Sequence, residues 1–208
     1  VTAYDMAMIT RAASKYSVFN DIVNTTTYTI KHNNKRKTDA TAIQRHKMVW
    51  PTSGYYYDGI IGGKTGFTDQ SGTTLVTYAK RNGMTLIAVV LHSNGTNVYK
   101  DTKELLDYGF NNFSRTAVKD LPTKITRHLL PAEKYILKDY KDDMLFETRR
   151  TASVSLPSGV DSNALEKTYS ITKNPEGLPL LTVTYTYNDH VVGSARYYQT
   201  KLLSDQLL

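Results

Sequence analysis

The sequence predicts an α+β domain followed by a small all-β domain, and three observations carry this prediction. Near the amino terminus, Thr2-Ala3-Tyr4-Asp5 has the form of a helix capping box. Further along, Asn82-Gly83 separates two β-rich runs, which is typical of a hairpin. After about residue 115, short runs rich in Thr and Tyr alternate with turns. We therefore expect residues 1–115 and residues 116–208 to form separate domains.

The first elements of the chain are expected to be helical. Apolar residues recur at helical spacing after the capping box and predict a helix over residues 3–16. These residues are Met6, Ile9 and Ala13. Residues 17–24 suggest a second, short helical turn, and residues 26–31 alternate as a strand. A basic loop opened by Asn33-Asn34 follows this strand.

The later elements are mostly strands. Residues 73–80 and 84–92 predict the two arms of the hairpin, and residues 98–113 return to helical spacing. In the second domain, residues 180–187 and 191–198 predict a pair of strands. Side chains on one face of the first of these two strands are apolar or aromatic. They are Leu181, Val183, Tyr185 and Tyr187.

The composition narrows the chemistry. An apolar content of 40% suffices for a real core, and no run approaches the roughly 20 apolar residues of a membrane span. The chain has no cysteine, which excludes disulfides and thiolate metal sites. Its five histidines lack metal-ligand spacing. We expect neither a metal nor another cofactor.

Lys64-Thr65-Gly66 is the most informative feature of the chain, and it follows an apolar, glycine-rich run. An ammonium and a hydroxyl can hold an anionic substrate, and a glycine lets another backbone approach. Gly63-Lys64-Thr65 also matches the end of a P-loop. That motif requires a glycine where Asp58 stands and a helix afterwards, so the nucleotide-binding interpretation fails. A glycine-rich turn with a solvated lysine is the remaining structural alternative.

The surroundings of this motif resemble a known family. Residues 1–113 are similar to the C-terminal half of the catalytic domain of the low-molecular-weight penicillin-binding proteins, the serine-type D-alanyl-D-alanine carboxypeptidases. The β-rich tail resembles, more weakly, their C-terminal accessory domain. The matching stretches agree in order and spacing, and they are residues 2–7, 62–68, 86–90 and 103–110. The resemblance implies a penicilloyl-serine transferase (β-lactamase-like) fold, with an antiparallel sheet between helices and the Lys-Thr-Gly strand at its edge.

The resemblance also implies roles for five residues. Enzymes of this family cut the terminal D-Ala from peptidoglycan stem peptides through an acyl-enzyme, and β-lactams acylate the same serine. By position, Lys64 would orient the substrate and a serine of the family's middle motif, and Thr65 would bind the substrate's carboxylate. Gly66 would leave space for strand addition, and the N–H of Phe67 would serve the oxyanion hole. Thr68 is a further candidate contact to the carboxylate.

The sequence departs from the family at its nucleophile. The family's Ser-x-x-Lys motif occurs only at Ser170–Lys173, in the predicted β domain, and Ser-x-Asn does not occur. We interpret Ser170 as a chance match, because a strand would not place the serine and lysine on one helical turn. The chain alone is therefore expected to be inactive and poorly stable, and the N-terminal half of the enzyme is expected upstream or as a separate chain.

A second departure concerns an arginine that many family members place just before the closing helix. Val98 stands at this place and cannot make a bidentate contact with a carboxylate. Either Lys100 or Thr68 substitutes, or selectivity for a terminal carboxylate is weakened. Carboxypeptidase, endopeptidase and transpeptidase activities stay open at this point.

The net charge of +7 is concentrated in the first domain, where residues 1–115 carry 14 Lys and Arg against 8 Asp and Glu. Much of the excess is clustered: Lys31, Lys35, Arg36, Lys37, Arg45 and Lys47. The cluster lacks a helical stripe or an aromatic stacking platform, so no nucleic acid partner is expected. A solvated loop or a surface attracted to anionic cell-wall polymer fits better.

The resemblance implies a protein that is secreted as a precursor and acts outside the cytoplasm, at the outer face of the membrane or in the cell wall. Peripheral association with the membrane is compatible with this location. Peptidoglycan stem peptides and β-lactams are the implied ligands. Two other functions stay open: a non-catalytic protein that binds the cell wall or acts as a scaffold, and a β-lactamase relative. The β-rich tail argues against the β-lactamase, which usually ends with the closing helix.

Overall fold

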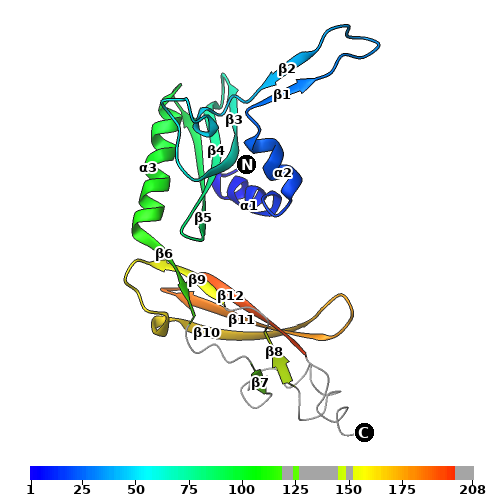
Figure 1. Ribbon diagram of the computed structural model, residues 1–208. Helices are drawn as coiled ribbons and strands as arrows, with labels where there is room; N and C mark the ends of the chain where they lie inside the picture. The colour runs from blue at the N-terminus through cyan, green and yellow to red at the C-terminus, as the bar shows by residue number, and fades with distance from the viewer. Residues whose placement is uncertain (119–123, 127–144, 149–151, 200–208) are drawn as a thin grey trace. The chain divides into compact units, whose positions relative to one another are not determined.

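The chain folds into two compact units, Val1–Asn112 and Phe113–Leu208, and the sequence had suggested a boundary between residues 115 and 116. Figure 1 shows the computed structural model. The structure describes residues 1–118, 124–126, 145–148 and 152–199.

The first unit opens with helices α1 (Ala3–Ala13) and α2 (Ser17–Asn24), as predicted. The capping box is formed: the Asp5 N–H donates to Thr2 Oγ1 at 3.1 Å, and the Thr2 N–H donates to Asp5 Oδ2 at 2.8 Å. The helix is shorter than the predicted range of residues 3–16, because Ser14 forms its C-cap. The two bonds satisfy backbone donors that would otherwise be unpaired at the start of the helix.

A three-stranded antiparallel sheet forms the centre of the first unit, in the order β3 (Ile60–Thr68), β4 (Gly72–Arg81) and β5 (Met84–Ser93). The predicted hairpin is confirmed. Its turn residues Asn82 and Gly83 both have positive φ, 49° and 76°, as a two-residue hairpin turn requires.

Helices lie on both faces of this sheet (Figure 1). Helix α3 (Asn97–Asn112) packs against one face; the helix was predicted over residues 98–113, and it begins and ends one residue earlier. The core on this side consists of Met48, Tyr57, Leu75, Ala79, Ala88, Val90, Val98, Tyr99 and Leu106. On the other face, the Tyr78 hydroxyl donates to Asn20 Oδ1 at 2.7 Å, and the Tyr78 ring stacks on Phe19 of α2. The sheet is thus held between helices.

A two-stranded hairpin, β1 (Thr27–Ile30) and β2 (Ala40–Ile43), projects from this unit (Figure 1). Strand β1 was predicted, whereas no strand was predicted over the residues of β2. A short 3-10 helix, Lys47–Val49, then leads the chain back to the core.

The second unit contains strands alone apart from a short 3-10 helix, Ser162–Ala164, in its described part. Strand β6 (Phe113–Ala117) pairs with β9 (Ser153–Pro157). The remaining strands form a second sheet in the order β10 (Glu166–Lys173), β11 (Pro179–Tyr187), β12 (His190–Gln199), β8 (Leu145–Glu147) and β7 (Lys124–Thr126).

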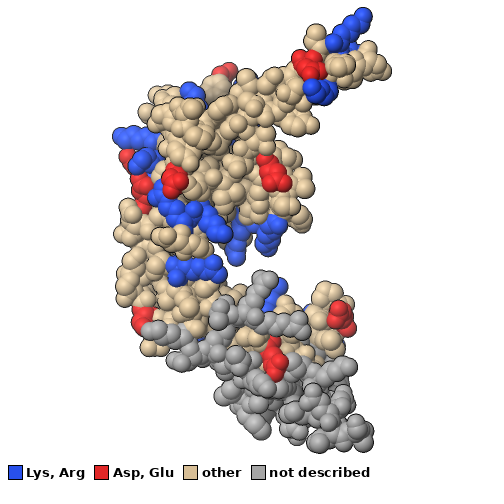
Figure 2. Space-filling model, in the orientation of Figure 1, with Lys and Arg blue, Asp and Glu red and all other residues tan. Residues whose placement is uncertain are grey.

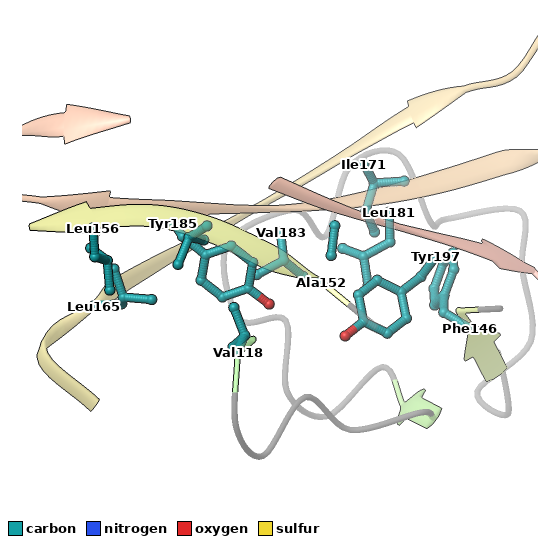
Figure 3. Packing of buried hydrophobic residues seen from close by; sticks show 12 residues of the cluster. Val118, Phe146, Ala152, Leu156, Leu165, Ile171, Leu181, Val183, Tyr185 and Tyr197 are labelled. Atoms are coloured by element: carbon teal, nitrogen blue, oxygen red, sulfur yellow. The ribbon is translucent and has the colours of Figure 1, made fainter. Parts of the chain in front are cut away.

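The apolar alternation predicted for β11 is confirmed at Leu181, Val183 and Tyr185, which are buried, whereas Tyr187 is only half-buried beyond the register shift between Tyr185 and Thr186. Side chains of both sheets meet in the core shown in Figure 3. Its members include Val154, Leu156, Leu181, Val183, Tyr185, Ala195 and Tyr197.

Candidate functional site

Lys64-Thr65-Gly66 lies on β3, which is the edge strand of the three-stranded sheet. Strand β4 pairs with one side of β3, and no described strand pairs with its other side. An edge strand presents unpaired N–H and C=O groups that can bind an extended peptide by strand addition. The motif therefore stands where a backbone can pair with it.

The register assigns the motif's side chains to two faces of the sheet. Lys64 lies opposite Val76, whereas Thr65 lies opposite Leu75, on the face covered by α3. The Lys64 side chain is exposed, Thr65 is half-buried, and Phe67 is 69% exposed. A cation and a hydroxyl thus flank the free edge from its two sides.

The Lys64 ammonium donates to the carbonyl of Thr65 at 2.5 Å. It borders a groove of about 520 Å³ between α2, the base of the β1–β2 hairpin and β3. Apolar residues dominate its lining, which includes Ile22, Val23, Tyr28, Ala42, Ile43, Asp21 and Lys64. Among these lining residues, Lys64 is the cation available to an anionic ligand.

Glycines ahead of the motif let other elements pack directly on β3. A Cβ added at Gly62 would collide with Val23 of α2, and one added at Gly63 would collide with the carbonyl of Val76 and the ring of His46. Gly66 is closed on one side in the same way, because an added Cβ would lie 2.5 Å from Thr74 Oγ1. The glycines therefore fix how closely the neighbouring elements approach the motif.

His46 is the buried polar residue behind β3. Its ring is fully buried, its Nε2 lies 2.7 Å from Thr77 Oγ1, and its Nδ1 accepts the N–H of Met48 at 3.2 Å. Because Nδ1 is an acceptor, the neutral ring carries its proton on Nε2 and donates it to Thr77. Burial lowers the pKa of His46 to about 4, and the nearby charge of Lys64 lowers it further.

This pair bears directly on β3, since Thr77 is the residue opposite Gly63 in the sheet. The spacing of the five histidines in the sequence gives no indication of this role. The available sequence indication was the Gly62-Gly63 pair, because consecutive glycines in a strand indicate the close approach of another group.

The turn between β3 and β4 constrains Thr68. The Thr68 N–H and hydroxyl both donate to Ser71 Oγ, at 3.1 and 2.8 Å, and the Ser71 N–H donates to Thr68 Oγ1 at 3.0 Å. His92 Nδ1 lies 3.2 Å from the carbonyl of Ser71. The Thr68 hydroxyl is therefore engaged in its own turn.

The segment that enters β3 is clamped from the other end. The Arg81 guanidinium lies 4.3 Å from the centre of the Tyr57 ring and donates to the carbonyl of Asp58 at 3.0 Å. The Tyr57 hydroxyl donates to Asp107 of α3 at 2.8 Å. Lys103 also bonds Asp107 and, as the main cause, lowers the pKa of that carboxyl. The clamp joins the entrance of β3 to the β4–β5 hairpin and to α3.

Val98, where the resemblance predicts the place of the family arginine, lies inside the core. Val98 is 1% exposed in the first turn of α3. Lys100, one of the two suggested substitutes, has an exposed side chain 3.9 Å from Glu104. The second suggested substitute, Thr68, bonds within its turn.

Ser170 and Lys173 both lie on β10 of the second unit. Residues three apart on a strand point to opposite faces, so these two side chains do not come together there. No group of three or more His, Asp or Glu in the described part of the chain could hold a metal ion. Among the described helices, none is long and apolar enough to cross a membrane.

Comparison with protein families agrees with this geometry. Residues 1–95 match the family model described as D-alanyl-D-alanine carboxypeptidase. The match covers just under half of the chain, which is similar to that family over this segment. The match covers helices α1 and α2, the β1–β2 hairpin and the whole three-stranded sheet, so the Lys-Thr-Gly strand lies inside the matched segment.

Solved structures extend the likeness to both units. Penicillin-binding protein 5 from Haemophilus influenzae is similar with a TM-score of 0.58 and 20% identity, over 95% of this chain and 55% of that one. Penicillin-binding protein 6B from Escherichia coli is similar with a TM-score of 0.52 and 18% identity, over 96% of this chain and 50% of that one. At these identities the likeness shows the fold. The chain spans about half the length of these two penicillin-binding proteins.

Proposed function

We propose that this chain supplies the substrate-binding strand of a serine-type D-Ala-D-Ala carboxypeptidase that acts on peptidoglycan stem peptides and binds β-lactams. The observation that carries the proposal is the position of Lys64–Phe67 on a sheet edge that no described strand pairs, within the segment that matches the family model. The family acts outside the cytoplasm, and the proposal places this chain at the outer face of the membrane or in the cell wall.

The chemistry of the strand follows from its residues. A stem peptide that ends in D-alanyl-D-alanine would add to the free edge of β3, where Gly66 gives its backbone room. The exposed ammonium of Lys64 and the hydroxyl of Thr65 would bind the terminal carboxylate through charge-assisted and neutral hydrogen bonds. The N–H of Phe67 would donate to the oxyanion that develops at the scissile carbonyl.

Thr68 has the weakest part in this proposal. Its hydroxyl already donates to Ser71 Oγ and accepts from the Ser71 N–H. A contact with the substrate carboxylate would require breaking the bond that it donates. We therefore assign Thr68 to shaping the end of the substrate strand.

Acyl transfer requires a nucleophile that residues 1–112 do not contain as a Ser-x-x-Lys motif. Catalysis by the proposed enzyme therefore depends on its N-terminal half, which would bring the serine and its lysine to β3. The chain alone would bind substrate weakly and form no acyl-enzyme, because one member of a cooperative constellation contributes little by itself.

The same absence favours a second candidate, a non-catalytic protein that binds the cell wall. Such a protein would keep the substrate strand without the serine. The two candidates differ in whether a Ser-x-x-Lys partner restores acylation by a β-lactam when it is added to this chain.

Binding of a peptide that ends in D-alanyl-D-alanine, measured by NMR titration, tests the proposal. We expect Lys64→Ala to weaken this binding by about tenfold or more, because it removes a charge-assisted bond worth about 1.4 kcal/mol. Lys80→Ala, which removes an exposed lysine from the neighbouring strand β4, is the matched control.

A peptide with a C-terminal amide should bind the wild-type protein as weakly as the carboxylate peptide binds the Lys64 variant. If both lysine variants bind the carboxylate peptide equally well, Lys64 is not the anion-binding group and the proposal fails. Intact mass spectrometry after incubation with penicillin should show no adduct on this chain alone. An adduct on this chain would mean that it carries its own nucleophile.

A further inference from the structure

The β1–β2 hairpin is the most exposed element of the first unit. Every residue of β1 and all of β2 except the half-buried Ala40 are exposed, although Tyr28 and Ile43 are large and apolar. A two-stranded hairpin is only marginally stable by itself in water. The strands alone would therefore do little to stabilise the hairpin, and its outer end, residues 31–39, contributes further bonds.

The outer end of the hairpin is built by internal bonds. Asn33 Oδ1 accepts the N–H groups of Lys35 and Arg36, both at 2.9 Å, and the Asn33 N–H donates to the carbonyl of Arg36 at 2.8 Å. The Arg36 guanidinium, which is half-buried, donates to the carbonyls of Ile30, Lys31 and Thr38. These bonds set the tip in one conformation before any partner arrives.

The same end concentrates positive charge. Residues 31–39 contain four Lys and Arg but one acid, Asp39, and basic side chains gather at the outer end of the hairpin (Figure 2). Asp39 is occupied by Lys31 and His32, each at 3.0 Å. The ammonium groups of Lys35 and Lys37 bond none of the described residues and stay exposed.

We propose that this tip docks the protein on a linear, phosphate-rich polymer. Exposed cations bind such a chain by releasing its condensed counterions, and this term needs no pocket. The internal bonds of Asn33 and Arg36 reduce the ordering cost of binding, because the backbone that carries Lys35 and Lys37 is already folded. The proposal does not depend on the peptide-binding role of Lys64.

The arrangement fits a polymer chain better than a membrane surface. In an element that inserts into a membrane, the apolar residues reach the lipid and the cations stay behind at the headgroups. Here the order is reversed, because the cations occupy the outer end and strand β1, which carries Tyr28 and Ile30, lies nearer the body of the unit. The tip would therefore hold the apolar residues of β1 away from a lipid surface.

Nucleic acid shares the phosphodiester chemistry of such a polymer but offers bases as well. Proteins that bind single strands place aromatic side chains where bases can stack. Residues 31–39 contain no Phe, Tyr or Trp. The tip can therefore bind the phosphates of a polymer but offers no aromatic side chain on which nucleic acid bases could stack.

Binding of the full chain to linear inorganic polyphosphate, measured by titration calorimetry over a range of salt concentrations, tests the proposal. We expect the double variant Lys35→Ala/Lys37→Ala to bind about tenfold or more weakly at low salt, with its log–log salt slope reduced by about two. Lys167→Ala/Lys173→Ala removes the same charge from exposed positions on β10 and should leave both quantities unchanged.

Equal losses in the two double variants would overturn the proposal, since binding would then follow net charge alone. No binding of the wild-type protein at low salt would overturn it as well. Tighter binding to vesicles of anionic phospholipid than to polyphosphate, lost in the tip variant, would make the partner a membrane. A preference of more than about tenfold for single-stranded DNA would make it a nucleic acid.

Discussion

The two units differ in how they treat buried polar groups. In the first unit, His46 and Thr77 are fully buried and bond each other at 2.7 Å. In the core of the second unit, Tyr185 and Tyr197 are equally buried, and their hydroxyls bond no group among the described residues (Figure 3). Burial raises the pKa of Tyr185 to about 12.

The difference shows that the buried His46–Thr77 pair positions secondary-structure elements, whereas the core of the second unit is held by packing. A bonded pair in a dry interior has directional geometry and fixes the elements that carry it, here Gly63 of β3 and the segment around His46. Apolar and aromatic packing in the second unit depends mainly on buried area and volume. Only in the first unit does the polar interior lie directly behind the proposed substrate strand.

The largest loss of stability is expected from a substitution in the apolar core of the second unit. Leu181→Ala should destabilise that unit by about 4 kcal/mol, through lost apolar contacts and the cavity left behind. Hydrogen exchange during urea unfolding would follow each unit separately. Val191→Ala, at a position 69% exposed on β12, is the control and should cost less than about 0.5 kcal/mol. A loss that spread equally to β3–β5 would contradict the independence of the two cores.

Gly63→Ala should disrupt the first unit, at a cost of about 3 kcal/mol, because the new methyl group would meet the Val76 carbonyl and the His46 ring. The loss should be concentrated in β3 and measurable as faster amide exchange of Lys64 and Thr65. Gly54→Ala is the matched control, since no atom lies within 4 Å of an added Cβ there. Equal stability of the two variants would show that His46 does not pack on β3.

Acid should weaken the first unit through His46. Its pKa is about 4 in the folded protein and about 6.5 in an unfolded chain, so the unfolded state binds the proton first as pH falls. Stability is then fully present above about pH 6.5 and should decrease by about 2 kcal/mol between pH 7 and pH 4.5. The His46→Gln variant should lose this part of the pH dependence in urea unfolding. An unchanged pH profile in the variant would assign the acid sensitivity to other groups.

The smallest changes in stability are expected when the hydroxyl groups of two tyrosines are removed. Tyr57→Phe removes the bond to Asp107 and should cost about 1 kcal/mol, whereas Tyr185→Phe removes an unbonded hydroxyl and should be neutral or slightly stabilising. Thermal unfolding of the two variants measures the difference directly. A cost at Tyr185 equal to that at Tyr57 would mean that the Tyr185 hydroxyl has a partner in solution.

Local chemistry made much of the fold predictable. The capping box at Thr2, the Asn82-Gly83 turn and the alternation in β11 each depend on residues close together in sequence, and all three are confirmed. Strand β2 was missed because its four residues are mostly exposed and carry no strong apolar alternation. Strand β2 forms because it pairs with β1, and the two strands are separated in sequence by the basic tip, residues 31–39.

The site was only partly predictable for the same reason. Lys64-Thr65-Gly66 could be recognised as a contiguous motif, and its strand was expected at the edge of a sheet. The burial of His46 could not be foreseen, because it depends on a bond to Thr77, which lies 31 positions further along the chain. The engagement of Thr68 with Ser71 likewise required the turn geometry.

Mapping the binding of a peptide ending in D-alanyl-D-alanine by backbone amide NMR tests the central claim most directly. The account predicts that the largest shifts fall on Lys64–Phe67 along the free edge of β3, with smaller shifts on the paired residues of β4 and none on β10 or β11. Shifts spread over the second unit, or centred away from β3, would contradict the assignment of β3 as the substrate strand.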